Sequence, residues 1–210
     1  MCTKEDMTEL KRCVHLMKKG YEVQKLSVIN NIERYLKEPG ANDELFSIII
    51  DSMLDWDTKM QKECASSFIS PLQAGLVDKK NSEKVAVSAV TILIDRDNWE
   101  NQELLDYWFQ VLEVVVGQVD IKFVSSQVIA KVKDLPAYKN EYEVRKMGNR
   151  LVLTIANGLG ELGFDKDPCL WKLVMGICED SNYNLRRDGV IFFKEYISKR
   201  KEEFLLSDRL

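Results

Sequence analysis

The chain has 210 residues, 45% of them hydrophobic, so it can bury a core as one domain or as one continuous array. Its 30 Lys and Arg residues against 34 Asp and Glu residues give a formal net charge of −4, which excludes a general attraction to nucleic acid or to an anionic membrane. Five scattered cysteines without a CxxC pair, and the single histidine His15, predict neither a disulfide framework nor a zinc site.

The N-terminus, MCTKEDMTELKRC, is too highly charged for a signal peptide. The longest apolar stretches, such as residues 86–94, have about half the length that a membrane span requires. We therefore expect a soluble, cytoplasmic protein of a reducing compartment, with no membrane association.

Apolar residues recur at helical spacing along the chain. One such face consists of Leu45, Ile48, Ile49, Met53 and Leu54, and a second consists of Leu104, Leu105, Trp108, Phe109, Leu112 and Val115. The β-branched clusters at 48–50 and 114–116 lie inside these longer helical segments, and no Asn-Gly or Asp-Gly hairpin signal is near them. The sequence therefore predicts an all-α protein without a sheet.

The predicted helices come in pairs. In chain order the segments are 8–20 with 21–37, 43–55 with 57–76, 81–96 with 100–117, 121–134 with 142–159, and 167–179 with 183–203. The pairs recur about every 36 to 43 residues, which is the period of two-helix HEAT and armadillo repeats. Because pairs this short cannot bury their apolar faces alone, neighbouring pairs must stack.

This period predicts the architecture of the whole chain. We expect a right-handed α-solenoid of about five HEAT-like helix pairs, formed as a single array over residues 1–210. The predicted pairs span roughly 8–40, 41–77, 78–117, 118–160 and 161–204.

The turns inside the pairs repeat a short motif. KNEYEVRKMG, with Val144-Arg145, has the same shape as EDSNYNLRRDG, with Leu185-Arg186 one repeat later. Asp57-Thr58 and Asn140 are placed to cap the second helix of their pairs. The helix dipole disfavours a cation in the first turn, so we expect Arg145 and Arg186 to reach an acidic residue of their own or the next turn. Direct contact with a ligand is the alternative for both.

Little in the sequence indicates an active site. His15 has no Ser or Asp arrangement around it, and the neighbouring acids at 95–97 and 179–180 point apart on a helix. Gly148, Gly158, Gly160 and Gly163 follow no strand and lack a Lys-Ser/Thr neighbour, so we expect them to end a helix and turn the chain. The sequence predicts a protein that is not an enzyme, with no metal site and no cofactor.

Four aromatic residues fall at predicted turns inside the pairs, namely Trp56, Trp99, Tyr142 and Tyr183. Aromatic residues at exposed turns are enriched in binding hot spots, although others only pack over helix ends, and both interpretations are open. Because such turns line up along one edge of a solenoid, the four residues can form a continuous ridge.

The order of the segments GYEVQKLSVINNIERYL, DTKMQKECASSF, DYWFQVLEVVVGQV and ICEDSNYNLRRDGVIFFKEYI resembles the HEAT-repeat scaffold and regulatory subunits of type 2A-like protein phosphatases. The resemblance spans roughly residues 8 to 204 and is greatest to the N-terminal repeats of protein phosphatase 4 regulatory subunits. It implies a non-catalytic solenoid that holds a metal-dependent Ser/Thr phosphatase catalytic subunit along the ridge of turns. The implied contacts are Trp56, Asp57, Lys59, Trp99, Tyr142, Glu143, Arg145, Tyr183, Asn184 and Arg186. Members of this family are several times longer than this chain, so a fragment, a short paralogue and a protein with a changed partner all remain open.

Other functions are compatible with the same fold. A tubulin-binding HEAT array of the TOG type has a similar length and places a Trp at an early turn, as DWDTKMQKECA does. Its later turns should be basic, because the surface of tubulin is acidic, and those of this chain are not clearly so. A HEAT-like DNA glycosylase would need a basic groove, which the net charge disfavours. A generic protein–protein adaptor is the remaining alternative, so in each favoured case the partner is a protein and not a nucleic acid.

Overall fold

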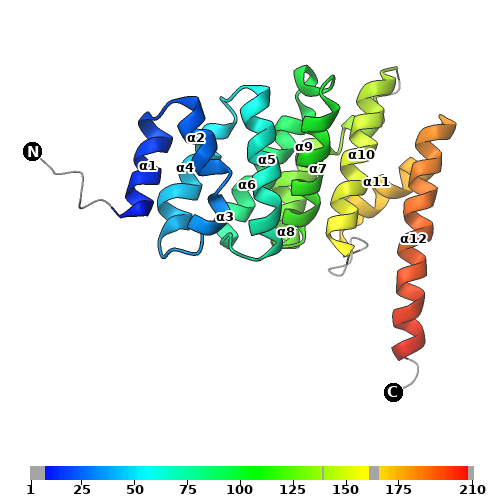
Figure 1. Ribbon diagram of the computed structural model, residues 1–210. Coiled ribbons are helices and arrows are strands. Elements are labelled where there is room, and N and C mark those ends of the chain that lie inside the picture. The colour runs from blue at the N-terminus through cyan, green and yellow to red at the C-terminus, as the bar shows by residue number, and fades with distance from the viewer. Residues whose placement is uncertain (1–7, 139, 161–165, 208–210) are drawn as a thin grey trace, which may run out of the picture. The chain divides into compact units, whose positions relative to one another are not determined.

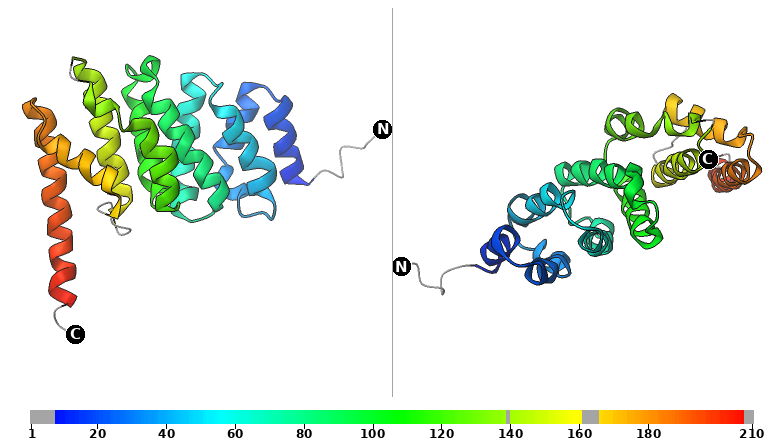
Figure 2. Two further views of the ribbon diagram at one scale, coloured as in Figure 1. Left: turned by 180° about the vertical axis from the view of Figure 1, so that it is seen from behind. Right: turned by 90° about the horizontal axis from the view of Figure 1, so that it is seen from above.

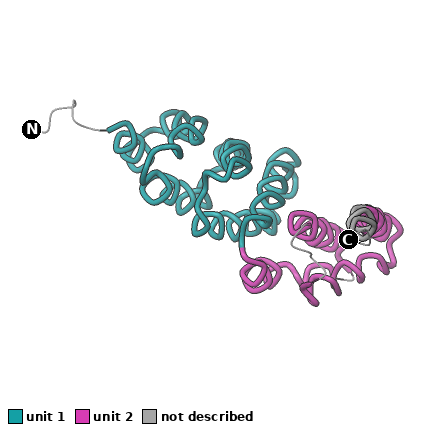
Figure 3. The backbone as a smooth tube through the Cα atoms, turned by 90° about the horizontal axis from the view of Figure 1, so that it is seen from below, with its two compact units in different colours: residues 1–119 teal, residues 120–210 magenta. Residues whose placement is uncertain are grey.

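The computed structural model describes residues 8–138, 140–160 and 166–207, with side chains described up to residue 198. Throughout these residues the regular elements are helices and none is a strand, which confirms the all-α prediction (Figure 1). The ends of the predicted array and Gly163 lie outside the described residues. The chain divides into two compact units, Met1–Val119 and Asp120–Leu210, and each is considered by itself (Figure 3).

Unit 1 holds the first three predicted pairs. Its helices are α1 (Glu9–Lys19), α2 (Glu22–Ile29), α3 (Ile32–Tyr35), η1 (Asn42–Phe46), α4 (Ser47–Met53), α5 (Thr58–Gln73), α6 (Lys79–Ile94), η2 (Arg96–Asn98) and α7 (Gln102–Val116). The first helices of the pairs contact one another in order, α1 with α4 and α4 with α6. The second helices do the same, α2 and α3 with α5 and α5 with α7, so the unit has two helical layers (Figure 2).

Aromatic side chains join the pairs of unit 1 through its core. The rings of Phe46 and Phe68 lie 4.8 Å apart between centroids, and Phe68 meets Trp108 edge to face at 6.4 Å. All three residues are fully buried, and each belongs to a different helix. Because a helix of this length is marginal alone, this shared core stabilises the pairs as one body.

Polar side chains also connect successive pairs at the surface of unit 1. Lys62 pairs with Glu103 at 3.1 Å, and Lys84 pairs with Asp51 at 2.7 Å. The paired residues are 41 positions apart in the first contact and 33 in the second, close to the predicted repeat period. Asn42 forms a less exposed connection between the second and third pairs. Its side chain donates to the carbonyl of Leu76 and accepts from the backbone N–H of Asp78.

The single helix predicted over 21–37 is wrong, because the chain breaks between α2 and α3 at Asn30 and Asn31. The side-chain amide of Asn31 donates to the carbonyl of Ser27 at 2.8 Å. That carbonyl would accept the backbone N–H of Asn31 in an unbroken helix. The asparagine side chain thus competes with the helical backbone and divides the segment.

Unit 2 holds the fourth and fifth predicted pairs. Its helices are α8 (Ile121–Phe123), η3 (Val124–Ile129), α9 (Ala130–Val132), η4 (Leu135–Ala137), α10 (Tyr142–Gly158), α11 (Pro168–Cys178) and α12 (Tyr183–Ser207). The helix predicted over 121–134 is present, but a π-helical segment interrupts it. Here η3 contacts α11 and α10 contacts α12, so the order of first and second helices found in unit 1 recurs.

Two glycines permit the close packing of unit 2. A Cβ atom on Gly148 would lie 2.6 Å from the Cβ of Leu135, and one on Gly189 would lie 2.7 Å from Cγ2 of Ile177. The expectation that Gly148 ends a helix is wrong, since it lies buried within α10 where η4 packs against that helix. Gly158 does lie at the end of α10.

Candidate functional site

The predicted binding residues of the second turn lie between α4 and α5. Asp57 caps α5, as predicted, because its carboxylate accepts the backbone N–H of Met60 at 2.8 Å. Lys59 is exposed and lies 3.6 Å from the carboxylate of Glu22. Trp56 is half-buried. At this turn the structure therefore combines one capping residue, one exposed ion pair and one partly accessible aromatic ring.

The third turn is ordered by its own tryptophan. The indole N–H of Trp99 donates to the carbonyl of Leu93 at 3.0 Å, which fixes the ring over the end of α6. The guanidinium of Arg96 lies 5.7 Å from the centre of the ring. Trp99 is half-buried, so much of its surface serves to close the turn.

The fourth turn leads into α10. Tyr142 is 38% exposed, and Glu143 forms an exposed ion pair with Lys146 at 3.4 Å. The predicted cap at Asn140 is wrong, because Glu141 occupies the position before α10. Arg145 instead points toward the following turn.

The ion pair between Arg145 and Asp180 joins the two turns of unit 2. Nε of Arg145 lies 3.0 Å from Oδ2 of Asp180, and their side chains are only 12% and 9% exposed. This is the contact expected between the arginine of one turn and the acid of the next. The other oxygen of Asp180 accepts the backbone N–H of Asn182 at 2.7 Å, so the carboxylate also shapes its own turn.

The fifth turn carries the most exposed of the predicted aromatic residues. Tyr183 is 67% exposed, and the guanidinium of Arg186 lies 6.0 Å from the centre of its ring. The prediction that Arg186 reaches the carboxylate of an acidic residue is wrong, because its guanidinium donates to the backbone carbonyls of Asp180 and Ser181. Asn184 is exposed, and its backbone N–H donates to the side chain of Asn182 at the start of α12.

The first turn also carries an exposed aromatic residue, which was not among the predicted contacts. Tyr21, at the start of α2, is 84% exposed. The signal was present, because GYEVQ has an aromatic residue at the same place as DWDTK, NWENQ, EYEVR and NYNLR. Every predicted turn therefore carries one aromatic residue, and those at the first and fifth turns are the most exposed.

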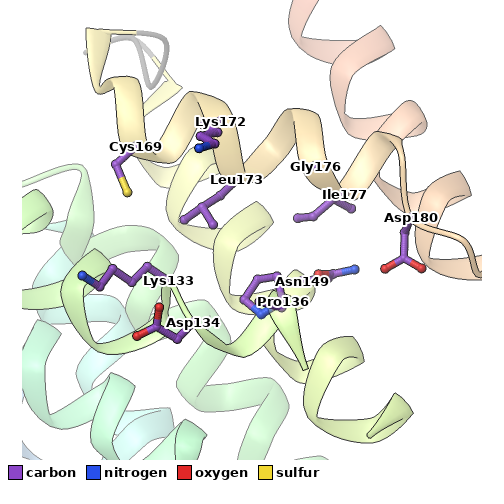
Figure 4. A pocket seen from close by; sticks show the side chains of 11 residues that line it. Lys133, Asp134, Pro136, Asn149, Cys169, Lys172, Leu173, Gly176, Ile177 and Asp180 are labelled. Carbon is purple, nitrogen blue, oxygen red and sulfur yellow. The ribbon is translucent and has the colours of Figure 1, made fainter. Parts of the chain in front are cut away.

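Unit 2 also contains a pocket that no sequence motif indicated. It has a volume of about 370 Å³, which is near the lower end of ligand-binding pockets. It lies between the end of α9 with η4 on one side and α11 on the other, with α10 behind it (Figure 4). The lining residues are Lys133, Asp134, Pro136, Ala137, Asn149, Cys169, Lys172, Leu173, Gly176, Ile177 and Asp180.

Asn149 is the distinctive residue of this pocket. It is 3% exposed, and neither its amide nitrogen nor its carbonyl oxygen has a hydrogen-bond partner among the described residues. Leu173 and Ile177 face it and Pro136 across the pocket (Figure 4). A buried carboxamide without partners costs free energy, so its retention among apolar walls calls for an explanation.

Within the described residues, no helix has the length and apolar character needed to cross a membrane. The same part of the chain contains no group of three or more His, Cys, Asp or Glu side chains placed to hold a metal ion. Comparison of the chain with protein-family models, with curated proteins and with solved structures finds no match. The function is therefore inferred from the geometry of the chain itself.

Proposed function

We propose that this protein is a non-catalytic scaffold that binds a protein partner through the turns inside its helix pairs. The pairs would stack as one right-handed HEAT-like solenoid. Support comes from the order of helix contacts, since first helices contact first helices and second helices contact second helices in both units. In such an array the helices bury the core and the turns lie at the surface, where their side chains are available to bind a partner.

The observation that carries the proposal is the pairing of Tyr183 with Arg186 at the fifth turn. Tyr183 is two-thirds exposed, yet the side chain of Arg186 beside it is tied to two carbonyls. Tyrosine and arginine, with tryptophan, are the residue types most enriched in interface hot spots, and an ordered side chain loses less entropy on binding. A fixed but accessible pair suits a protein interface better than a solvated surface.

The first partner to test is the catalytic subunit of a type 2A-like Ser/Thr phosphatase, because the turn motifs resemble those of its scaffolds. Tyr183→Ala should weaken binding of the purified catalytic subunit by about 2 kcal/mol, or roughly 30-fold, as loss of a hot-spot aromatic does. Ile197→Ala is the matched control, because Ile197 is 51% exposed on the same helix away from the turn. Equal affinity of both variants and the unmodified chain would remove the fifth turn from the interface.

A tubulin-binding array is the second candidate, and the exposure of Tyr21 favours it. Arrays of the TOG type place a tryptophan at an early turn, and Tyr21 is an aromatic residue that is 84% exposed at the first turn. Lys59 at the second turn is less favourable, because it already pairs with Glu22. Co-sedimentation with tubulin that Tyr21→Ala abolishes and Tyr183→Ala preserves would favour this candidate over the phosphatase scaffold.

A further inference from the structure

A peptide group bound in the pocket can form hydrogen bonds with the side chain of Asn149. A carboxamide presents one acceptor and two N–H donors, and those of Asn149 have no partner among the described residues. The N–H and C=O of one residue in an extended peptide can bond to the oxygen and nitrogen of such a carboxamide together. Occupation by a peptide would thus remove the cost of burying Asn149 unpaired.

The residues that line the walls and rim of the pocket determine which ligand side chains can lie next to that peptide group. Leu173, Ile177 and Pro136 provide an apolar wall beside Asn149. Lys133 and Lys172, both exposed, line opposite sides of the pocket. Asp180 is already neutralised by Arg145, which leaves Asp134 as the single carboxylate against two lysines. The rim therefore favours a negatively charged ligand around an apolar centre.

We propose that this pocket binds an extended segment of a protein partner in which an aliphatic residue is flanked by acidic residues. The peptide group of the aliphatic residue pairs with Asn149, its side chain fills the space beside Leu173 and Ile177, and the flanking carboxylates meet Lys133 and Lys172. The inference depends on the proposed function only for the source of the segment, a protein partner. The site itself is distinct from the exposed ring of Tyr183.

Gly176 allows the pocket to be closed without disturbing the core. It lines the pocket on α11, and a Cβ atom there would meet no atom within 4 Å. Gly176→Leu therefore adds an isobutyl side chain to the pocket lining at a position where the new Cβ meets no other atom. Asn149→Leu replaces the unpaired carboxamide by an apolar side chain with the same number and branching of heavy atoms, and should leave the thermal midpoint unchanged or raise it.

The test uses a display library of random heptapeptides selected on the full chain, with the Gly176→Leu chain as counter-selection. We expect enriched peptides with Asp or Glu next to an aliphatic residue, binding both Gly176→Leu and Asn149→Leu at least tenfold more weakly than the unmodified chain. Circular dichroism melts of both variants confirm that they fold. Selection of no peptide over the counter-selected chain, or of peptides that both variants bind equally, overturns the site. Enrichment of basic or uncharged peptides overturns the assigned ligand chemistry.

The same variants separate this inference from the proposed function. Tyr183→Ala should retain the selected peptides, because the tyrosine does not line the pocket. If a protein partner depends on Tyr183 while no peptide is selected, the pocket proposal fails and the scaffold proposal stands. If peptides are selected but no partner depends on the turns, the scaffold proposal fails and the pocket proposal stands.

Discussion

At the scale of single residues, Arg145 shows how a predicted binding residue acquires a structural role. Its charge is held against Asp180 with both side chains almost fully covered. An arginine in that position contributes to a partner's binding only through the atoms that remain exposed. Among the predicted contacts, the exposed ring of Tyr183 is therefore the better candidate for contact with a partner.

The first prediction follows from that ion pair. Asp180→Asn should lower the free energy of unfolding by about 3 kcal/mol, because it removes the carboxylate charge that lies 3.0 Å from the nearly buried guanidinium of Arg145. Glu143→Gln is the matched control, since Glu143 and Lys146 form an exposed pair that should contribute less than about 0.5 kcal/mol. Urea denaturation measures both. Equal stability of the two variants would show that the Arg145–Asp180 pair is not buried in solution.

The cysteines give a second prediction, on reactivity and pH. Complete burial raises the pKa of the Cys64 thiol well above its ordinary range, whereas Cys169 is exposed. Iodoacetamide at pH 8 should therefore alkylate Cys169 in the folded protein and leave Cys64 unmodified until the chain unfolds.

The same pKa shift fixes the sign of a pH effect on stability. A folded state that favours the neutral thiol binds more protons than the unfolded chain above the ordinary thiol pKa of about 8.5. The stabilising contribution is thus fully present below that pH and declines as the pH rises toward the folded pKa. Mass spectrometry of the alkylated chain and melts from pH 7 to 10 check both statements. Rapid labelling of Cys64 in the folded chain would contradict its burial.

At the scale of elements, the helices could be predicted because apolar residues recur at helical spacing along the sequence. The break at Asn31 could not, because an asparagine divides a helix only where its side chain captures a nearby carbonyl, here that of Ser27. Gly148 was misjudged for a related reason. Glycine ends many helices, but here the contact of η4 with α10 requires a residue without a side chain.

The third prediction compares the same substitution in two helices. Gly176→Ala should stabilise the protein by about 0.5 kcal/mol, because alanine favours the helix and the added atom meets open space. Gly148→Ala should destabilise it by about 1 to 3 kcal/mol, because the added Cβ would lie within 3 Å of Leu135 and Pro136. Thermal melts of the two variants should shift in opposite directions. A stabilising Gly148→Ala would mean that η4 does not pack closely on α10.

At the scale of the whole molecule, the turns were easier to predict than the pocket. Asp57 as a cap and an arginine-to-acid contact between turns follow from local residue types and the repeat period. The pocket depends on segments far apart in sequence, since Lys133, Asn149 and Gly176 come together only after the helices pack. Nothing in MGNRLVL indicates that Asn149 lacks a partner, because that absence is a property of its neighbours.

We propose that the exposed aromatic residues at the first and fifth turns are the main contacts for a partner. Tyr21 in unit 1 and Tyr183 in unit 2 are more exposed than the aromatic residues at the turns between them in the sequence. The tryptophans at the second and third turns are half-buried, and Trp99 at the third closes the end of α6 through a hydrogen bond to the carbonyl of Leu93. We therefore expect the first and fifth turns to contribute most of the binding free energy. The second to fourth turns should contribute mainly shape complementarity to the partner.

Hydrogen–deuterium exchange of the full chain, with and without the purified phosphatase catalytic subunit, tests the central claim most directly. The account predicts slower exchange on binding in the peptides that cover the turns, above all the peptides that contain Tyr21 and Tyr183, with the first helices of the pairs unchanged. Ile197→Ala should preserve this protection and Tyr183→Ala should lose it. Protection confined to the helical faces away from the turns, or no change at saturating catalytic subunit, would contradict the claim that this protein is a scaffold recognising that partner through its turns.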